Sequence, residues 1–547
     1  MRLGLLVGLL LLVSGVAHSA PDIARPRVAA TVVEWPAAAA AVTQYEGLQT
    51  AANSKTDALA RLNEAAGRLL PTIATSPVPV LLPIDVAGIL RDKPVAKDEG
   101  FAASSDAYFS GYHYPRFFLA GPGGFDSTFT ILTSDIKELA DISIPDPVDI
   151  HFSGFAFTYE LDGAIADLHP IPVPALEAKF PGIRRFIYEG YVRYSFVQYG
   201  VPYVLAIDCF EGRPRLLRLI CTQADRIAVH FLSQLRIAGG TPQKAHTIEP
   251  PLVERETATD PVFKYHGPGK IFPGSGFRDA GGRVDYTVWA QIRFPLSAAP
   301  AYANSQVYRE RTKSKTAPKD VYNSPEYSYP WRDNFCERRG FTVGQCPAGI
   351  GHQGQDIRPA PCAAPLGNER CEPAHDVVAV RDGAIMRNPK QEAAYIVVNN
   401  ANEHIRFRYL HMEPRKMDEN NLLSGREVHE GEVIGQVSNF SQKENGTSYH
   451  LHFDVQVPTR NGWAFVSPYM TLVVGYERLI GGRGVEIVDQ PQAAQAIERD
   501  FRAAQMPPTA QPVSAPLETR PKLRPDDSKH SPKNQAGVNE PHKIPIE

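Results

Sequence analysis

The sequence predicts a mainly β, multidomain protein with some α-helix, in which a mixed, mainly β domain precedes a second domain that contains β-strands. Three observations predict this class. The 547 residues include 48 prolines and 42 glycines, which favour turns and linkers over a helical bundle. Short aromatic and β-branched runs dominate residues 100–300. Near the other end, apolar and polar residues alternate strictly over residues 449–455, as in a strand with one buried face.

The first nineteen residues are typical of a secretory signal peptide. Arg2 precedes the apolar run Leu3–Val16, and small residues lead up to a cleavage site before Ala20. The alternative is a membrane anchor, but the run is shorter than the roughly 20 residues that span a bilayer. We therefore expect export of the chain, with no stable membrane span after the signal is cleaved.

The remaining segments differ in composition, and the changes between them predict the domain boundaries. Residues 56–70 have apolar side chains at helical spacing, which predicts one helix in an Ala- and Pro-rich segment. Residues 224–235 predict a second helix, inside the mainly β domain. The expected organisation is a signal peptide at 1–19, an Ala/Pro-rich segment at 20–99, a mixed, mainly β accessory domain at 100–300, a linker at 301–334, a second β domain at 335–480, a short helix at 481–504 and a disordered tail at 505–547.

Six cysteines fall into three couples that are local in sequence, which suits an exported protein with disulfide bonds. The alternative is a zinc site with cysteine ligands, but no couple has the close spacing usual for such ligands. We expect the disulfides Cys209–Cys221, Cys336–Cys346 and Cys362–Cys371.

The formal net charge is −3, so the bulk charge gives no attraction to nucleic acid or to an anionic membrane. The basic stretch 309–319 is most simply a solvated surface. Residues 100–300 contain no ligand spacing, nucleophile elbow or phosphate-binding loop that points to a reaction.

Two short motifs carry metal-binding chemistry. His352 and Asp356 lie four residues apart in a segment with two glycines, and His450 and His452 lie on the same face of the predicted strand at 449–455. Imidazole nitrogens and a carboxylate oxygen suit a divalent transition metal such as zinc. His411 ends a second predicted strand at 404–411, which we expect to pair with 395–398. The spacing alone does not say which histidine of the 450/452 pair binds the metal.

The order of these motifs resembles a known family. The sequence reads GHxGxD at 351–356, a V-x-A-x-x-D-G-x-I segment at 377–385, a strand ending Y-x-H at 409–411, a GxxVxxGxxIGxV segment at 425–437 and HLHF at 450–453. This order resembles the lysostaphin/LytM-type zinc metallopeptidases, which cleave peptide bonds in bacterial peptidoglycan. The resemblance covers residues 345–475 and makes 335–480 the peptidase domain.

The resemblance implies a role for each matching position. His352, Asp356 and His452 would be ligands of one Zn²⁺ per chain, and His411 and His450 would be the catalytic histidines. The implied fold is a compact antiparallel β-sheet with a narrow groove above it. Three segments differ from the family pattern and would border that groove: the loop with Cys362 and Cys371, residues 412–424 and residues 445–448.

Two functions follow from the resemblance as expectations. The first is an exported zinc endopeptidase that acts on peptidoglycan peptides in the periplasm or cell envelope of a bacterium. The alternative is a zinc-containing cell-wall binding or regulatory protein of the amidase-activator type, which does not hydrolyse its target. The long region before residue 335 suggests either autoinhibition, released by a regulatory protein partner, or a wall-contact module.

Overall fold

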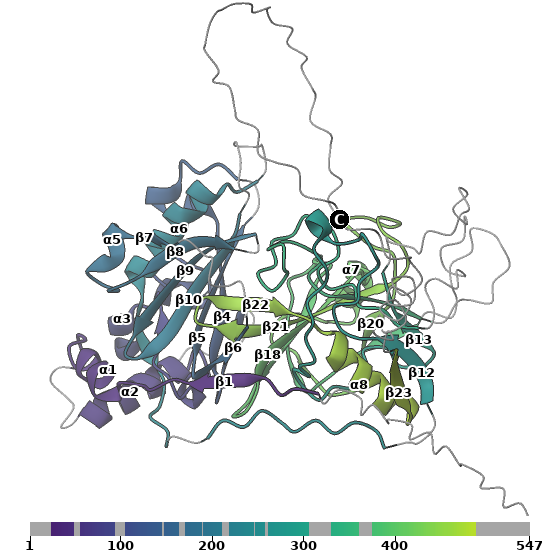
Figure 1. Ribbon diagram of the computed structural model, residues 1–547. Coiled ribbons are helices and arrows are strands. Elements are labelled where there is room, and N and C mark those ends of the chain that lie inside the picture. The colour runs from purple at the N-terminus through teal and green to yellow at the C-terminus, as the bar shows by residue number, and fades with distance from the viewer. Residues whose placement is uncertain are drawn as a thin grey trace, which may run out of the picture. The chain divides into compact units, whose positions relative to one another are not determined.

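The computed structural model describes residues 23–48, 55–92, 104–144, 147–162, 170–188, 190–209, 218–244, 247–257, 261–305, 330–359 and 375–487, which all belong to one compact unit that ends at Ile487. Everything said below about the structure refers to these ranges. The predicted signal peptide, the Cys362–Cys371 disulfide and the tail at 505–547 lie outside them. Figure 1 shows the elements with their labels.

A seven-stranded antiparallel sheet, called the front sheet below, forms from the residues that the sequence predicts as the accessory domain. Its strand order is β3-β4-β5-β10-β9-β8-β7, so hairpins connect most neighbours. Its central strands alternate between an aromatic face and a polar face, which gives the sheet one side for a core and one for other contacts. The strands are β3 (Phe117–Gly121), β4 (Gly124–Ile131), β5 (Val148–Phe155), β7 (Ile171–Pro172), β8 (Arg184–Tyr188), β9 (Tyr191–Gln198) and β10 (Val201–Asp208).

Helices cover the aromatic face of the front sheet. Phe231 of the longest of these helices has its ring centroid 5.4 Å from that of Phe129 and 5.8 Å from that of Phe152, so this core is built largely from aromatic rings. The helices of this region are α1 (Trp35–Val42), α2 (Lys55–Gly67), α3 (Val86–Arg91), α5 (Pro174–Glu177) and α6 (Cys221–Gln234). Short strand pairs complete it: β1 (Arg27–Ala30) with β6 (Phe157–Glu160), and β2 (Val80–Leu82) with β11 (Arg236–Gly239).

The predicted helices at 56–70 and 224–235 correspond to α2 and α6. The sequence predicted one helix within 20–99, whereas the structure has α1 and α3 there as well. Both lack the periodic pattern on which the prediction relied. α1 is almost uniformly apolar, and α3 has only six residues.

An eight-stranded sheet, called the rear sheet, contains the predicted metal motifs. Its order is β13-β14-β21-β18-β17-β16-β19, with β22 paired to β21. The predicted pairing of 395–398 with 404–411 is the β17–β18 hairpin. The strands are β13 (Ala301–Ala303), β14 (Gln355–Pro359), β16 (Gly383–Met386), β17 (Ala394–Asn399), β18 (His404–Leu410), β19 (Glu427–Val428), β21 (Leu451–Thr459) and β22 (Gly462–Val466).

The helix α8 (Tyr469–Ile480) packs with the apolar face of the rear sheet in a second core, in which Phe407 of β18 and Phe453 of β21 stack at 6.0 Å. Two sheets dominated by antiparallel strands confirm the prediction of a mainly β fold. The remaining elements of this region are α7 (Pro414–Glu419), the pair β15 (Asp376–Val378) with β20 (Val433–Gln436), and the parallel pair β12 (Pro261–His266) with β23 (Arg483–Ile487).

Residues 261–303 and Trp331 belong to the rear core, although the sequence places them in the accessory domain and the linker. Strand β13 extends the rear sheet by pairing with β14. The indole of Trp331 is fully buried, and its ring centroid lies 4.7 Å from that of Tyr476 on α8. The polar composition of the segment around Trp331 does not reveal this contact, because the partner is more than a hundred residues away. At the other end, β23 occupies the start of the segment predicted as a short helix.

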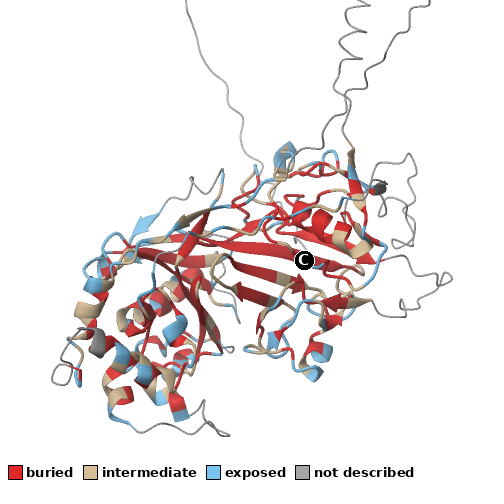
Figure 2. Cartoon of the chain, turned by 90° about the horizontal axis from the view of Figure 1, so that it is seen from below, coloured by how far each residue is buried: buried red, intermediate tan, exposed pale blue. Residues whose placement is uncertain are grey.

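The polar faces of the two sheets meet, and a buried carboxylate holds them together. Asp126 of β4 lies 2.7 Å from His404 Nε2 and accepts a 2.7 Å hydrogen bond from the Arg406 guanidinium, both on β18. All three side chains are at least 94% buried. His404 Nδ1 lies 3.0 Å from the carbonyl of Gly123, so both ring nitrogens face oxygen acceptors. Figure 2 shows how continuous the buried residues are along the central strands.

Burial alone would raise the pKa of Asp126, but the charges of Arg406 and His404 outweigh it and lower that pKa. A lowered folded-state pKa contributes stability above the unfolded value of about 4, and this stability is lost as the pH falls through the folded pKa. The contact between the sheets should therefore hold from neutral pH down to mildly acidic conditions.

We predict that Asp126→Asn lowers the free energy of unfolding at pH 7 by about 3–5 kcal/mol, because it leaves two basic side chains buried without their carboxylate. Urea denaturation measures this loss. The difference in free energy of unfolding between the variant and the wild type should persist down to about pH 4 and become smaller only below that pH. As a control, Asp141→Asn removes an exposed partner of Arg226 and should leave the midpoint unchanged. Equal effects of the two substitutions would contradict the structural role of Asp126.

Candidate metal centre

Strand β21 positions the predicted site because its side chains alternate between two environments. Leu451, Phe453 and Val455 lie in the rear core. His452 and Asp454 lie on the opposite face, and His450 directly precedes the strand on that same side. Antiparallel pairing with β14 places Asp356 directly opposite His452, where side chains on one face of a sheet meet.

The structure brings His352, Asp356 and His452 together, with one ligand atom of each within 4.8 Å of the others. His352 Nε2 lies 3.4 Å from Asp356 Oδ1, and His452 Nδ1 lies 3.5 Å from the same oxygen. All three residues are buried. Two imidazole nitrogens and one carboxylate oxygen that converge in this way leave a fourth position open, which is the donor set of a catalytic zinc site.

Neighbouring groups orient each ligand. The Nδ1 atom of His352 donates to the carbonyl of Asn334 at 3.0 Å, which leaves the Nε2 lone pair for a metal. The amide of Asn334 also donates to Asp356 Oδ2 at 2.7 Å. On the other side, His452 Nε2 lies 3.3 Å from Asp454 Oδ2, so Nδ1 is the nitrogen that faces the other ligands. Asp454 is held in turn by Arg408 of β18.

The two remaining predicted histidines lie beside the ligands. His450 is fully buried, donates from Nδ1 to the carbonyl of Ser448 at 2.7 Å, and places Nε2 3.4 Å from Asp356 Oδ1. His411 donates from Nδ1 to the carbonyl of Phe440 at 2.8 Å, and its ring centroid is 4.7 Å from that of His450. Within the described residues, His450 Nε2 has no hydrogen-bond partner. A buried nitrogen of this kind is available to a metal-bound or substrate group.

Burial and mutual charge set the protonation of this cluster. Burial lowers the pKa of His352 to about 4, so that histidine is neutral at pH 7. Burial together with the neighbouring His450 and His452 holds the pKa of His411 well below its ordinary value. For Asp356, the opposing effects of His352 and His450 exceed that of burial and hold its pKa well below the ordinary range. Burial opposes the charged form of His452, but the hydrogen bonds and charges of Asp356 and Asp454 outweigh it and raise the pKa of that histidine. The cluster therefore offers an ionised carboxylate and a neutral His352, and a metal would have to displace any proton on His452.

Residues 352–465 match the model of peptidase family M23. This part of the chain is an M23 peptidase domain. The match confirms the predicted resemblance to LytM-type peptidases, and it spans all five predicted histidine and aspartate positions.

Two solved structures are similar to the chain. One is described as a candidate glycyl-glycine endopeptidase, lytM, from Ruminococcus gnavus; it is 21% identical, with a TM-score of 0.18, and the match covers 25% of this chain and 50% of that one. The other is Csd3 from Helicobacter pylori; it is 12% identical, with a TM-score of 0.15, and the match covers 67% of this chain and 57% of that one. The chain thus spans about half the length of each structure. No curated protein matches it.

Glycine is required where the M23 domain brings its motif against β21. A Cβ atom on Gly354 would lie 2.4 Å from the carbonyl oxygen of Phe453 and 2.9 Å from His452 Nε2. Either distance is too short for a side chain, so any other residue would push the first motif away from the strand that carries the histidines.

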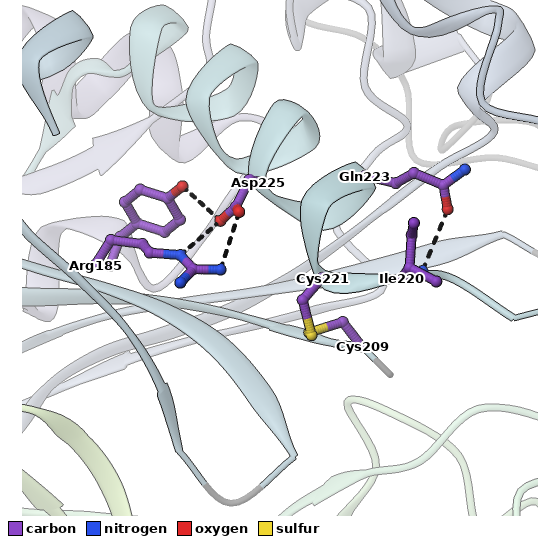
Figure 3. The surroundings of a disulfide bond; sticks show 7 residues. Arg185, Cys209, Ile220, Cys221, Gln223 and Asp225 are labelled. Carbon is purple, nitrogen blue, oxygen red and sulfur yellow. Dashed lines mark hydrogen bonds and ion pairs between the residues drawn. A yellow bond between two sulfur atoms is a disulfide. The ribbon is translucent and has the colours of Figure 1, made fainter. Parts of the chain in front are cut away.

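Two of the three expected disulfides lie in the described residues, and both are present. Cys336–Cys346 lies beside the M23 motif, where the Cys336 N–H donates to the carbonyl of His352 at 3.0 Å. Cys209–Cys221 joins β10 to the first residue of α6, close to the ion pair of Arg185 and Asp225 (Figure 3). The first disulfide therefore restrains the segment that enters the metal centre, and the second restrains the front sheet.

Sequence reasoning missed Asn334, which contacts two of the candidate ligands. It lies in the segment predicted as a linker, and nothing in its neighbourhood distinguishes it from any other polar residue of a loop. Asp454 was visible on the polar face of the strand, but its contact with His452 follows only from the structure. Arg408 was also missed, although its place opposite Asp454 follows from the β18–β21 register.

We predict that His352→Ala and His452→Ala each abolish stoichiometric zinc binding, because either change removes one of three donors. Metal content of the purified chain, measured by plasma mass spectrometry, should fall from one zinc per chain to a small fraction. His411→Ala should keep its zinc, as should the control His429→Ala, which changes a histidine whose side chain is 86% exposed. Full zinc content in His352→Ala and His452→Ala would show that these residues are not ligands.

Proposed function

We propose that the protein is an exported, zinc-dependent endopeptidase that hydrolyses peptide bonds in bacterial peptidoglycan. The observation that carries this proposal is the convergence of five side chains in an M23 domain: three candidate ligands, His450, whose Nε2 faces Asp356, and His411, whose ring lies beside those of His450 and His452. A domain that only binds its target has no chemical need for the two additional histidines.

Zinc, when bound, would supply a Lewis acid that polarises the scissile carbonyl and acidifies a water molecule. Residues of the chain would then act on the proton of this water molecule. His450 holds its Nε2 in the buried site through the Ser448 contact and is placed to accept a proton from the attacking water. His411 is held through the Phe440 carbonyl and, as a neutral imidazole with its proton on Nδ1, would offer Nε2 as a second acceptor that orients the attacking water.

The disulfides support the proposal that the protein functions outside the cytoplasm. Disulfides persist in oxidising compartments, and the structure has one in each half of the described chain. In the part of the chain that the structure describes, no helix has the length and apolar character to cross a membrane. The expected signal peptide completes this proposal of an exported protein.

We predict that the purified protein releases soluble muropeptides from isolated sacculi, and that mass spectrometry of the products identifies the cleaved bond. A chelator should abolish release, and added zinc should restore it. His450→Ala should retain zinc but lose about 10²–10⁴-fold in rate, because a general base is removed. His429→Ala serves as the control with unchanged rate. If the zinc-loaded wild type released nothing from several types of sacculus, the alternative of a binding or regulatory protein would be favoured.

We also propose that the front sheet restrains access to the metal centre. It packs on the same face of the rear sheet that carries the ligands, through Asp126, His404 and Arg406. A wall-contact module would not need this position. A regulatory protein partner that separates the two sheets would then increase activity.

We predict that Asp126→Asn, which loosens the contact, raises the turnover of a short soluble peptide several-fold at 25 °C, where the variant remains folded. A fluorogenic peptide assay measures this rate, and circular dichroism verifies the fold. The control is again Asp141→Asn, with an expected rate equal to that of the wild type. Unchanged or lower turnover in the folded Asp126→Asn variant would count against restraint by the front sheet.

A further inference from the structure

The front and rear sheets do not close completely against each other: a cavity of about 550 Å³ remains between them. Both sheets supply its walls. His151, Tyr191 and Arg193 come from β5 and β9 of the front sheet, and Tyr395 and Arg406 come from β17 and β18 of the rear sheet. Trp463 and Phe465 of β22 add an apolar surface.

The floor of this cavity continues the face that carries the metal cluster. Gln456 lines the cavity and follows His452 by four residues on β21, so both point to the same side of the sheet. At about 3.3 Å per residue, the two positions are roughly 13 Å apart. An extended peptide needs about four residues to cover this distance. Arg406 lies opposite Gln456, and Arg408 lies opposite Asp454, so β18 follows the same path.

The inner end of the cavity is rich in hydrogen-bond donors. Arg406 is 5% exposed, and among the described residues its Nε has no hydrogen-bond partner. One carboxylate, that of Asp126, serves both Arg406 and His404. Arg193 also lines this end and donates to the carbonyl of Trp463 at 2.7 Å. The local balance of buried charge is therefore positive.

Two tyrosines add neutral donors. Both line the cavity, and within the described residues neither the Tyr191 hydroxyl nor the Tyr395 hydroxyl forms a hydrogen bond. Burial, with contributions from Tyr395 and Asp208, raises the pKa of Tyr191, so its hydroxyl keeps its proton. Phenols without partners beside two guanidinium groups are suited to hold a carboxylate.

Carboxylates also line the cavity, and Asp208 lies directly opposite Tyr191 in the β9–β10 pair. Asp149 already accepts hydrogen bonds from Thr130 and Asn388, whereas Asp208 is exposed. Glu392 is half-buried and accepts from the Gln442 N–H. A ligand that complements both kinds of group carries a carboxylate for the guanidinium groups and an ammonium group for these acids.

We propose that this cavity is a subsite, formed jointly by the two sheets, for a peptide segment that carries a free carboxylate and a free amino group. This inference rests on the proposed function, since it identifies the peptide as part of the substrate whose scissile bond lies at the metal centre. The diamino acid side chain of a peptidoglycan stem peptide has this chemistry. The front sheet then has two roles, because it restrains the groove and also provides one wall of the subsite.

Isothermal titration calorimetry of the full chain tests the subsite. The probes are the tripeptide L-alanyl-γ-D-glutamyl-meso-diaminopimelate and its analogue with both diaminopimelate carboxylates amidated. We expect the wild type to bind the acid at least tenfold more tightly than the amide, because charge-assisted hydrogen bonds to Arg406 and the tyrosines are lost on amidation. Equal affinity for the two probes would overturn the proposal.

The double substitution Tyr191→Phe/Tyr395→Phe removes two hydroxyls that hold no other part of the described structure. It should weaken binding of the acid about fivefold, leave binding of the amide unchanged, and raise KM for stem peptides without lowering kcat. Arg406→Lys, which keeps the charge opposite Asp126, provides a second variant and should also reduce the preference for the acid. Tyr108→Phe is the matched control, since Tyr108 is not among the residues that line the cavity and its hydroxyl donates to Asp92. Full preference for the acid in both cavity variants would contradict the assigned residues.

These outcomes are separate from those of the proposed function, because binding of the tripeptide does not require hydrolysis. A chain that prefers the acid but releases nothing from sacculi would have the subsite without the peptidase activity. A chain that digests sacculi but binds acid and amide equally would have the activity without the subsite.

Discussion

The two-residue period of β21 is the constraint on which the rest of the structure depends. Alternate residues of this strand enter the rear core, and the residues between them must therefore face the other way. The polar face is not exposed to water, since His452, Asp454 and Gln456 are all buried. Buried polar groups need partners, so the strand requires ligands, counter-charges and a covering sheet within a few ångströms.

Those partners form a chain of contacts from the metal centre to the front sheet. His452 contacts Asp454, Asp454 binds Arg408, and the next residues along the strands are Gln456 and Arg406. Arg406 then reaches Asp126 on the other sheet. Three of these contacts place one basic group beside one acidic group, and between them the Gln456 amide donates to Asp454 at 3.3 Å. The metal centre and the contact between the sheets are thus two ends of one buried polar surface.

The sequence revealed the parts of this arrangement that depend on local pattern. The alternation around His452, the hairpin that ends near His411 and the glycine beside His352 all follow from period, turn chemistry and backbone freedom. These features fix the rear sheet and five site residues. The helices α2 and α6 were visible for the same reason, since their apolar residues recur at helical spacing.

The parts that the sequence did not reveal depend on pairs that are distant in the chain. Asp126 and His404 are separated by 278 residues, and neither has a neighbour that marks it as an interface residue. The same holds for Trp331, whose polar surroundings suggested a linker although the indole is fully buried. Contacts between residues that are distant in the sequence determine whether such positions are buried, and the local amino-acid composition does not indicate these contacts.

When a second domain covers the face of a sheet that carries a functional site, the usual interpretation is that it only blocks access to that site. Here ion pairs, hydrogen bonds and two small apolar clusters join the two sheets, and a cavity lined by polar groups remains beside them. A cover whose only task is to exclude substrate would be expected to fill this space with apolar side chains, because buried guanidinium groups are costly without full partners. The hydrogen-bond donors of Arg406, Tyr191 and Tyr395 in this cavity are better explained by a ligand that accepts hydrogen bonds from them. A peptide long enough to reach from the metal centre to this cavity would satisfy those donors, whereas a shorter one would leave them without partners. Substrate length and charge would then be selected by the same contact that restrains the site.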